Sequence, residues 1–405
     1  MHAGAAVVDI TPDRDLWLAG FDTARRSDGV HDPLSVRALV VTRGFFRITL
    51  VALDLIGIQR QELLPIFEEL GYPAGHAIIA CTHTHSSPDT LGLWGRPPFV
   101  GGVDGEYFAR VKDAIIQAVR EAERNLQPAE MATTSIIVNA SGIGRNLRRP
   151  GIEDRDCVIV HFRATARDEQ NTQATIATLV EFGCHPEVIG SSHAQVSADY
   201  PHWLRKRIER SIGGAAIYVS GALGGLVSPE ARSIPAAYEW HEVERIGVHL
   251  SRVALNAIHE LDNYSSSGLL ATWHAPLFLA QENTLYDIAR WTGIIDRDLF
   301  GSGYLETEVN LWQLGPLSIA SIPGEITPDL GLRIKEAMDG SSTMLIGLAN
   351  DELGYLLPDL DYDLPIYRYE RTLCVGRNAG ELVTRRLELL ARLARQQARA
   401  VRLQH

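Results

Sequence analysis

The sequence predicts a single large α/β domain in which mixed β-sheets are layered against helices. Short apolar runs typical of strands alternate with amphipathic stretches typical of helices along the whole chain. No internal repeat and no low-complexity linker marks a domain boundary. The 405 residues, of which 45% are hydrophobic, are enough to bury a sizeable core. We therefore expect one domain over residues 1–405, in which residues 376–405 form a C-terminal helix.

Apolar runs that are rich in β-branched residues and bounded by turn residues predict the strands. The first two runs flank Arg43-Gly44 and are expected to form a hairpin. The third run is short and apolar throughout, as is typical of a buried strand. In chain order, the predicted strands are residues 35–42, 46–55, 76–81, 157–163, 174–182, 215–219, 268–278, 306–312, 317–322 and 343–348.

Helices are predicted where apolar residues recur at helical spacing. The clearest helix covers residues 104–126, because Asp104 can cap it and Val111, Ile115 and Val119 share one apolar face. The predicted helices are residues 59–70, 104–126, 201–212, 239–261, 329–338 and the Arg-rich stretch 380–402.

Two stretches without a clear period, residues 229–237 and 280–302, are predicted to be long loops that could cover a site. Aromatic residues in or near the loop regions could shape an apolar pocket there, although simple packing would also explain them. These residues are Trp94, Phe99, Trp240 and Trp291.

Charge and cysteine content exclude several classes of function. The formal net charge of −12 disfavours binding to nucleic acid and docking on an anionic membrane. No apolar stretch approaches the ~18–20 residues of a membrane-spanning helix, and the N-terminus lacks the pattern of a signal peptide. The four cysteines are scattered without a CxxC pair. We therefore expect a cytoplasmic protein with no nucleic-acid partner and no stable membrane insertion, and a homo-oligomer is left open.

The strongest chemical signal follows the predicted strand that ends at Cys81. The chain there reads Cys81-Thr82-His83-Thr84-His85-Ser86-Ser87-Pro88-Asp89. On an extended segment, His83 and His85 point to the same side, because side chains alternate with period two. Two imidazoles on one side of a strand end are suited to binding a metal ion, but they could equally be two polar loop residues.

A further histidine follows another apolar strand, in the segment Val180-Glu181-Phe182-Gly183-Cys184-His185-Pro186-Glu187. Pro186 ends strand pairing directly after His185. A single histidine at a strand end is more often structural than a ligand. Together with the first pair it becomes a candidate, because catalytic zinc takes about three protein ligands and keeps one position open.

Three other segments place reactive side chains after apolar strands. Ile322-Pro323-Gly324-Glu325 presents a carboxylate, and Leu353-Gly354-Tyr355 presents a phenol. Residues 219–229 run into a glycine-rich turn that carries Ser228. Each pattern is weak alone, since ordinary turns and packing also produce it.

Taken in order, these motifs resemble the N-terminal catalytic domain of the neutral/alkaline (non-lysosomal) ceramidase family. That family shows T-H-T-H-S-G-P, a single strand-end histidine, G-D-V-S-P, P-G-E, and an Asn…Gly-Tyr turn followed by a Tyr-Glu pair. Five motifs in the right order are more specific than any one of them, and the matches run from about residue 5 to 375. The matching positions are residues 8–12, 82–88, His185, 225–229, 323–325, Asn350, Gly354-Tyr355 and Tyr369-Glu370.

The resemblance implies a zinc-dependent hydrolase that cleaves a linear amide bond in a small-molecule substrate. The implied zinc ligands are His83, His185, Glu325 and Tyr355. Two neutral imidazoles and one carboxylate leave zinc with positive charge, which lowers the pKa of bound water toward ~7. A phenol would be a further, weaker ligand that could loosen as the substrate arrives.

The resemblance also implies the catalytic residues. It places His85 beside the metal, in contact with the substrate carbonyl or the developing oxyanion, and Ser228 as the catalytic serine. It implies a substrate-contacting arginine within residues 145–150, where the alignment fits either Arg145 or Arg148, and it places Tyr369 in the lining of the site. The choice between direct attack by water and an acyl-serine intermediate is left open.

Two positions depart from the family motifs, because Leu226 stands where the family has Asp and Ser87 where it has Gly. Enzymes of the family are usually secreted or membrane-associated and carry a C-terminal β-sandwich domain. This sequence instead predicts a helix at its end. We therefore expect a substrate that is smaller or more soluble than ceramide.

Other enzyme classes fit the same histidines less well. TIM-barrel amidohydrolases also use HxH after a strand, but they add a metal-bridging lysine and an eight-fold βα repeat, and no such repeat is visible here. Metallo-β-lactamase-like enzymes use HxHxDH, whereas Asp89 lies six residues after His83 and no histidine follows it. The remaining alternatives are a zinc-dependent esterase or lactonase and a catalytically degenerate homologue that binds zinc or another ligand.

Overall fold

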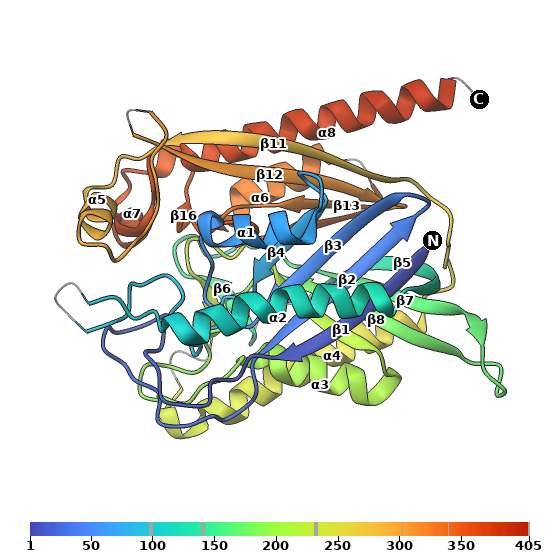
Figure 1. Cartoon of the computed structure of the whole chain (residues 1–405), viewed down its shortest axis with the longest axis horizontal. Coiled ribbons are helices and arrows are strands. Elements are labelled where there is room, and N and C mark those ends of the chain that lie inside the picture. The colour runs from blue at the N-terminus through green and yellow to red at the C-terminus, as the bar shows by residue number, and fades with distance from the viewer. Residues whose placement is uncertain (97–99, 139–141, 231–233, 302, 339, 404–405) are drawn as a thin grey trace.

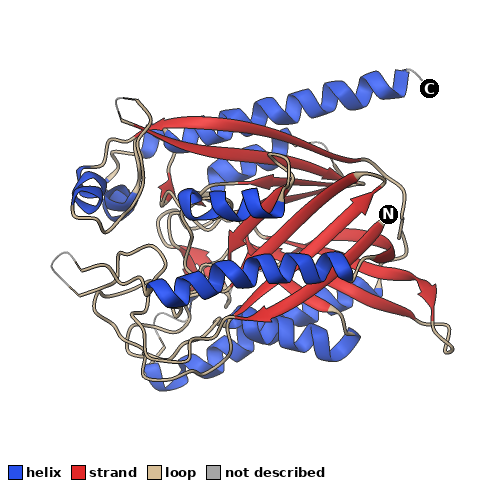
Figure 2. Cartoon of the chain, in the orientation of Figure 1, coloured by secondary structure: helices blue, strands red, loops and turns tan. Residues whose placement is uncertain are grey.

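The computed structural model describes residues 1–403 except 97–99, 139–141, 231–233, 302 and 339, and it describes side chains as far as residue 397. The described chain is arranged in four layers: helices, a large sheet, a smaller sheet and a second set of helices (Figures 1 and 2). This arrangement confirms the prediction of mixed β-sheets flanked by helices. None of the described helices is both long enough and apolar enough to cross a membrane.

The large sheet has eight strands in the order β4-β3-β2-β1-β5-β7-β8-β9. The pairs β3–β4 and β8–β9 are parallel, and the pairs between them are antiparallel. The predicted hairpin of the first two strands is confirmed as β2–β3. The strands of this sheet are β1 (His2–Asp9), β2 (Ser35–Arg43), β3 (Phe46–Leu53), β4 (Ala77–Cys81), β5 (Gln127–Ile137), β7 (Asp156–Arg167), β8 (Gln173–Phe182) and β9 (Ala215–Ser220).

The smaller sheet and two short ribbons complete the β-structure. The smaller sheet has the order β11-β12-β13-β15, with β11 (Leu270–Ala280), β12 (Tyr304–Leu314), β13 (Leu317–Ser321) and β15 (Ser342–Ile346). One ribbon pairs β6 (Gly144–Asn146) with β10 (Val227–Pro229). The other pairs β14 (Glu325–Ile326) with β16 (Tyr355–Leu356) in parallel. The two ribbons carry four of the residues that the motifs single out: Arg145, Ser228, Glu325 and Tyr355.

Helices cover the outer faces of both sheets (Figure 1). α1 and α2 pack on β1–β4, α3 and α4 pack beside β7–β9, and α6 and α8 cover the smaller sheet. Between the sheets, Leu50 and Val160 of the large sheet share a core with Trp312, Ile319 and Met344 of the smaller one. The helices are α1 (Arg60–Leu70), α2 (Gly105–Arg124), α3 (Tyr200–Ile212), α4 (Glu239–His259), α5 (Thr284–Trp291), α6 (Pro328–Ala337), α7 (Arg368–Leu373) and α8 (Ala379–Leu403).

Eight of the described strands and helices were not predicted by the sequence: β1, β5, β6, β10, β14, β16, α5 and α7. β1 consists mainly of small residues with weak strand preference, and Gly4 allows a close approach of α2, because a Cβ there would lie 2.2 Å from the Ala122 carbonyl oxygen. The prediction that residues 280–302 form an unstructured loop was wrong in part, because Asn283 accepts a hydrogen bond from the Leu285 amide and caps α5. Residues 231–233 of the other predicted loop lie outside the described residues.

Candidate metal centre and active site

His83 lies two residues beyond the end of β4, at a sharp turn of the chain. Its backbone φ of +70° is in the left-handed region that non-glycine residues rarely adopt. Its Nδ1 lies 2.6 Å from the carbonyl oxygen of Ile56, which fixes the orientation of the ring. The prediction that His83 and His85 lie on one side is correct, but a turn rather than a continuing strand brings them together.

His185 follows β8 and is fully buried. Its Nδ1 lies 3.0 Å from the carbonyl oxygen of Val227, and its Nε2 lies 2.9 Å from Oε2 of Glu325. The second oxygen of Glu325 lies 3.6 Å from Nε2 of His83. The carboxylate of Glu325 thus faces both histidines.

Glu325 and Tyr355 are neighbours in register across the β14–β16 ribbon. Gly324 permits this pairing, because its φ is +153° and a Cβ at Gly324 would lie 2.6 Å from the Gly354 carbonyl oxygen. The Tyr355 side chain also contributes to lowering the pKa of the Glu325 carboxylate. The four predicted zinc ligands therefore lie together in the fold.

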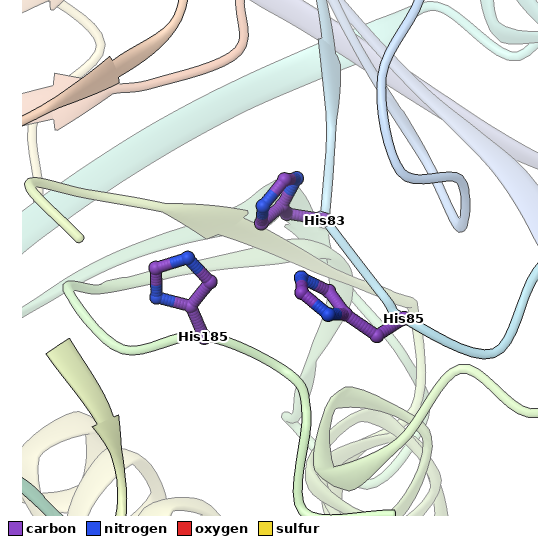
Figure 3. A group of neighbouring side chains, drawn as sticks. All are labelled: His83, His85 and His185. Carbon is purple, nitrogen blue, oxygen red and sulfur yellow. The ribbon is translucent and has the colours of Figure 1, made fainter. Parts of the chain in front are cut away.

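His85 completes a triangle with His83 and His185, and Figure 3 shows the three histidine rings turned toward one another. The ring centroids of His85 lie 4.9 Å from His83 and 5.7 Å from His185. One ligand atom from each of the three histidines falls within 4.8 Å of the others, so this group could hold a metal ion. Gly20 packs directly on His85, since a Cβ at Gly20 would lie 2.4 Å from Cβ of His85.

Burial and mutual contacts shift the pKa values of these groups. Burial lowers the pKa of His83, which favours the neutral imidazole that binds metals. Burial acts in the same direction on His185, but the hydrogen bond to Glu325 and the charge of Glu187 outweigh it and raise the pKa of His185. Burial would raise the pKa of Glu325, but His83 and His185 outweigh it and lower that pKa.

The hydrogen bonds determine which nitrogen of each histidine faces inward. A carbonyl oxygen can only accept, so Nδ1 of His83 and Nδ1 of His185 carry protons, and both Nε2 atoms face Glu325. Because His185 meets an acceptor at both nitrogens, its ring needs either a second proton or a cation in place of that proton. Two imidazoles held by backbone carbonyls and one carboxylate are a donor set typical of zinc. These residues therefore fit the ion that the motifs imply.

A cavity of about 200 Å³ opens onto this centre. His83, His85, Glu325, Tyr355 and Tyr369 line it. Most of the remaining wall is apolar and includes residues 285, 286, 289 and 295 of the predicted loop 280–302, so that segment does border the site. The apolar lining residues are Ile56, Leu91, Leu93, Trp94, Leu285, Ala289, Ile295, Leu353 and Leu373.

Of the four aromatic residues predicted to shape a pocket, only Trp94 lines this cavity among the described residues. Trp240 instead stacks on His31 with ring centroids 3.6 Å apart, and Trp291 is 87% exposed. Phe99 lies outside the described residues.

Comparison with known proteins supports the same architecture. No family model matches the chain. The neutral ceramidase of Mycobacterium tuberculosis is 25% identical over an alignment of 244 residues that covers 55% of this chain and 37% of that protein. The solved neutral ceramidase from Pseudomonas aeruginosa covers 98% of this chain and is matched over 74% of its own, with 19% identity and a TM-score of 0.79. A solved ceramidase complexed with C2 is matched over 98% of this chain and 75% of its own, with 17% identity and a TM-score of 0.80.

The chain has a neutral ceramidase-like fold. The resemblance predicted from the five motifs is confirmed at this level. The aligned region spans little more than a third of the curated relative, and the fold match spans about three quarters of each solved chain.

In this neutral ceramidase-like fold, Ser228 is buried behind the histidines and does not line the cavity. Its hydroxyl donates a hydrogen bond to Oε1 of Glu187. The other oxygen of Glu187 lies 3.5 Å from Nδ1 of His85. Glu187 therefore connects the predicted serine to the predicted oxyanion residue. Glu187 stands two residues after His185 in the same motif, but no sequence pattern indicated a role for it.

The two candidate arginines of the neutral ceramidase-like motif lie outside the cavity lining. Arg145 pairs with Ser228 through the β6–β10 backbone, but its side chain is exposed. Arg148 donates from Nε to Oε1 of the buried Glu370 at 2.6 Å. Tyr369, next to Glu370, does line the cavity, and its ring centroid lies 6.1 Å from that of Tyr355. Of the two candidate arginines, Arg148 is thus the one whose side chain contacts the segment that carries Tyr369.

Proposed function

We propose that this protein is a zinc-dependent hydrolase that cleaves the linear amide bond of a small N-acyl compound. The observation that carries the proposal is the inward orientation of His83 and His185 around Glu325, with both Nδ1 atoms held by carbonyl oxygens. This donor set lies at the base of a largely apolar cavity. The neutral ceramidase-like fold supports amide hydrolysis as the reaction.

In this proposal, His83, His185, Glu325 and Tyr355 hold the zinc ion. A bound zinc ion would supply positive charge that polarises a carbonyl group and makes water more acidic. Tyr355 is the weakest donor, because burial and the charge of Glu325 raise the pKa of its hydroxyl well above the ordinary value. We therefore assign His83, His185 and Glu325 as the strong zinc ligands. Tyr355 would be a weak ligand that substrate could displace.

The cavity is suited to an acyl chain of modest length. Its wall near Leu91, Leu93 and Trp94 is apolar, and at about 200 Å³ it is smaller than a typical drug-sized ligand site. His85 lines the same cavity and is placed to donate a hydrogen bond to the oxygen on which negative charge develops. Leu226, which stands where the family motif has Asp, packs with Tyr355 and Tyr367 in an apolar cluster. Its contribution is therefore to packing.

Glu187 and Ser228 support His85 from behind. Because Ser228 is fully buried and lies outside the cavity lining, attack by water is favoured over an acyl-serine intermediate. Glu187 is close enough to His85 to orient its ring. Ser228 in turn orients Glu187, so we propose it as a positioning residue.

Elemental analysis combined with a hydrolysis screen tests this function. About one zinc ion per chain is expected, together with release of 4-nitroaniline from N-octanoyl-4-nitroanilide that stops on chelation and returns with zinc. The matched 4-nitrophenyl octanoate separates an amidase from an esterase. Zinc binding without turnover of either compound would reject hydrolysis in favour of a binding role. Absence of bound zinc after zinc is supplied would reject the metal centre itself.

A further inference from the structure

Glu352 is a buried carboxyl group in the wall of the proposed active site, outside the set of metal ligands. It is 9% exposed and lines the same cavity as His83, Glu325 and Tyr355. Its Oε1 accepts a hydrogen bond from the Gly354 amide at 2.9 Å. Its Oε2 has no hydrogen-bond partner among the residues that the structure describes. One oxygen is therefore held by the backbone while the other remains available to a bound molecule.

The side chain of Glu352 is held in place from behind by Gly57. A Cβ at Gly57 would lie 2.7 Å from Cγ and 3.1 Å from Cβ of Glu352. Gly57 directly follows Ile56, whose carbonyl oxygen fixes the ring of His83. The carboxyl of Glu352 and the metal-binding face of His83 are therefore positioned by the same short segment.

No described basic side chain neutralises Glu352. The lining of the cavity includes Glu325 and Glu352 but neither Arg nor Lys. Of the nearby arginines, Arg297 makes two hydrogen bonds to Asp351, at 2.7 and 2.6 Å, and Arg60 is paired with Glu308. Their charges are already compensated.

A buried carboxylate without a partner is costly, because it loses the solvation that water provides. Burial and the charge of Glu325 raise the pKa of the Glu352 carboxyl well above its usual range. The free carboxyl therefore favours its protonated form. A cation placed against Oε2 would take the place of that proton, stabilise the ionised carboxylate and supply the missing hydrogen-bond donor. A hydroxyl would supply only the donor, and an anion would not stabilise the ionised form.

We propose that Glu352 makes this site selective for N-acyl compounds whose amine part carries an ammonium group within a few bonds of the scissile nitrogen. The proposal rests on the proposed function, since it assigns the substrate class of that site. The ammonium group would donate to Oε2 of Glu352, while the acyl chain lies against Leu91, Leu93 and Trp94. Glu352 thereby acts as a specificity-determining residue rather than as a metal ligand.

Three octanoyl amides of equal length test the selectivity: N-octanoyl-ethylenediamine, N-octanoyl-ethanolamine and N-propyl-octanamide. They end in an ammonium group, a hydroxyl and a methyl group. We expect the zinc-loaded wild type to show a kcat/KM at least about tenfold higher for the ammonium compound than for the methyl compound. Glu352→Gln should lower kcat/KM for the ammonium compound at least about tenfold more than for the methyl compound.

Two further variants identify the cause of any change. Gly57→Ala should reduce the ammonium preference as well, because the added methyl group displaces the Glu352 side chain. Glu306→Gln, which removes a half-exposed carboxyl outside the cavity lining, should leave all three values within about twofold. Equal losses for the three amides in Glu352→Gln, or a wild type without ammonium preference, would overturn the proposal.

Isothermal calorimetry measures how tightly the same amides bind to the chelator-treated protein. Because this measurement needs no hydrolysis, it tests the selectivity of Glu352 separately from the proposed amidase function. Tighter binding of the ammonium compound that is lost in Glu352→Gln supports the selectivity, even when no amide is hydrolysed after zinc is returned. Hydrolysis of all three amides with equal binding rejects the role of Glu352 and leaves the amidase function standing.

Discussion

The buried hydroxyl of Ser228 donates a hydrogen bond to the carboxylate of Glu187. The second oxygen of that carboxylate lies 3.5 Å from Nδ1 of His85, which borders the cavity. A serine that is matched to a catalytic motif is thus separated from the cavity by a carboxylate and an imidazole. This arrangement favours a serine that acts through its neighbours.

Replacing Glu187 tests the connection. Glu187→Gln should lower kcat by about 10–100-fold while zinc content stays at the wild-type level, because the carboxylate orients His85 but holds no metal. Ser228→Ala should cause a smaller loss, and Ser228→Thr, which keeps the hydroxyl, should recover part of it. Steady-state kinetics and zinc content check both variants. A Ser228→Ala variant that is inactive while Glu187→Gln is normal would instead indicate an acyl-serine pathway.

The roles of the two motif histidines are distinguishable by metal content. His83→Ala, His185→Ala and Glu325→Ala should lose zinc while circular dichroism shows a folded protein, because the large core does not depend on the site. His85→Ala should keep zinc but lose about 10²–10³-fold in kcat, as expected of an oxyanion donor. Loss of zinc in His85→Ala with retention in His83→Ala would reverse the two assignments.

Gly20 offers a test of His85 without changing the histidine. Gly20→Ala would place a methyl group 2.4 Å from Cβ of His85, so the ring must shift and kcat should fall toward the His85→Ala value with zinc retained. Gly44→Ala is the matched control, because Gly44 also has a positive φ but has no atom within 4 Å of the added Cβ. Similar kcat losses in both variants would mean that backbone strain, not His85, causes the effect.

In the zinc-free protein, the contribution of His185 to stability should fall as the pH rises. Although burial opposes it, the pKa of His185 is raised above 6.5 in the folded state, so its stabilising contribution is complete below pH 6.5 and is lost as the pH rises through the raised pKa. Zinc affinity changes in the opposite direction, because binding displaces protons from the ligands. The difference in Tm between zinc-loaded and chelated protein should therefore increase as the pH rises from about 6 to 9, as measured by thermal unfolding.

The variant His185→Gln identifies the group responsible for this pH dependence. The Tm of its chelated form should fall less over the same pH range than the Tm of the chelated wild type, because the histidine with the raised pKa is absent. Parallel curves for the two chelated proteins would contradict the assignment to His185.

The segment that carries α5 is tied to the site by Arg297 and Asp351, which are both buried. Arg297→Met leaves the Asp351 carboxylate uncompensated and should reduce the free energy of unfolding by about 3–5 kcal/mol. KM should also rise, because Ile295 beside Arg297 forms part of the cavity wall. Denaturant unfolding is the measurement. Arg371→Met, which removes a partly exposed partner of the exposed Asp363, should change the free energy of unfolding by less than about 1 kcal/mol, and a loss equal to that of Arg297→Met would contradict the prediction.

Much of the fold was predictable because its elements carry strong local signals. The apolar runs at 46–55, 76–81 and 174–182 became β3, β4 and β8. β1 was missed because small residues have little strand preference by themselves, and its stability comes from pairing with β2 and packing under α2. α5 was missed because it is only eight residues long and begins at a side-chain cap within a long connection.

The candidate site shows a similar division. The strand-end positions of His83 and His185 were predicted because an apolar strand followed by a polar residue is a local pattern. Glu187 received no role, because its partners Ser228 and His85 come from other segments of the chain. Glu352 carried no signal either, since its significance depends on a cavity wall built by residues far apart in the sequence.

By itself, the sequence determined the layered α/β class, the order of most strands and helices, and the chemical identity of the donor residues. These properties depend on hydrophobic periodicity and on residue type, which are local features of the sequence. Tertiary structure decided which donors meet, which nitrogen of each histidine faces inward, and which carboxyl groups are buried beside them. Those outcomes depend on hydrogen bonds such as His83 to Ile56 and His185 to Val227, which form only when distant segments pack together.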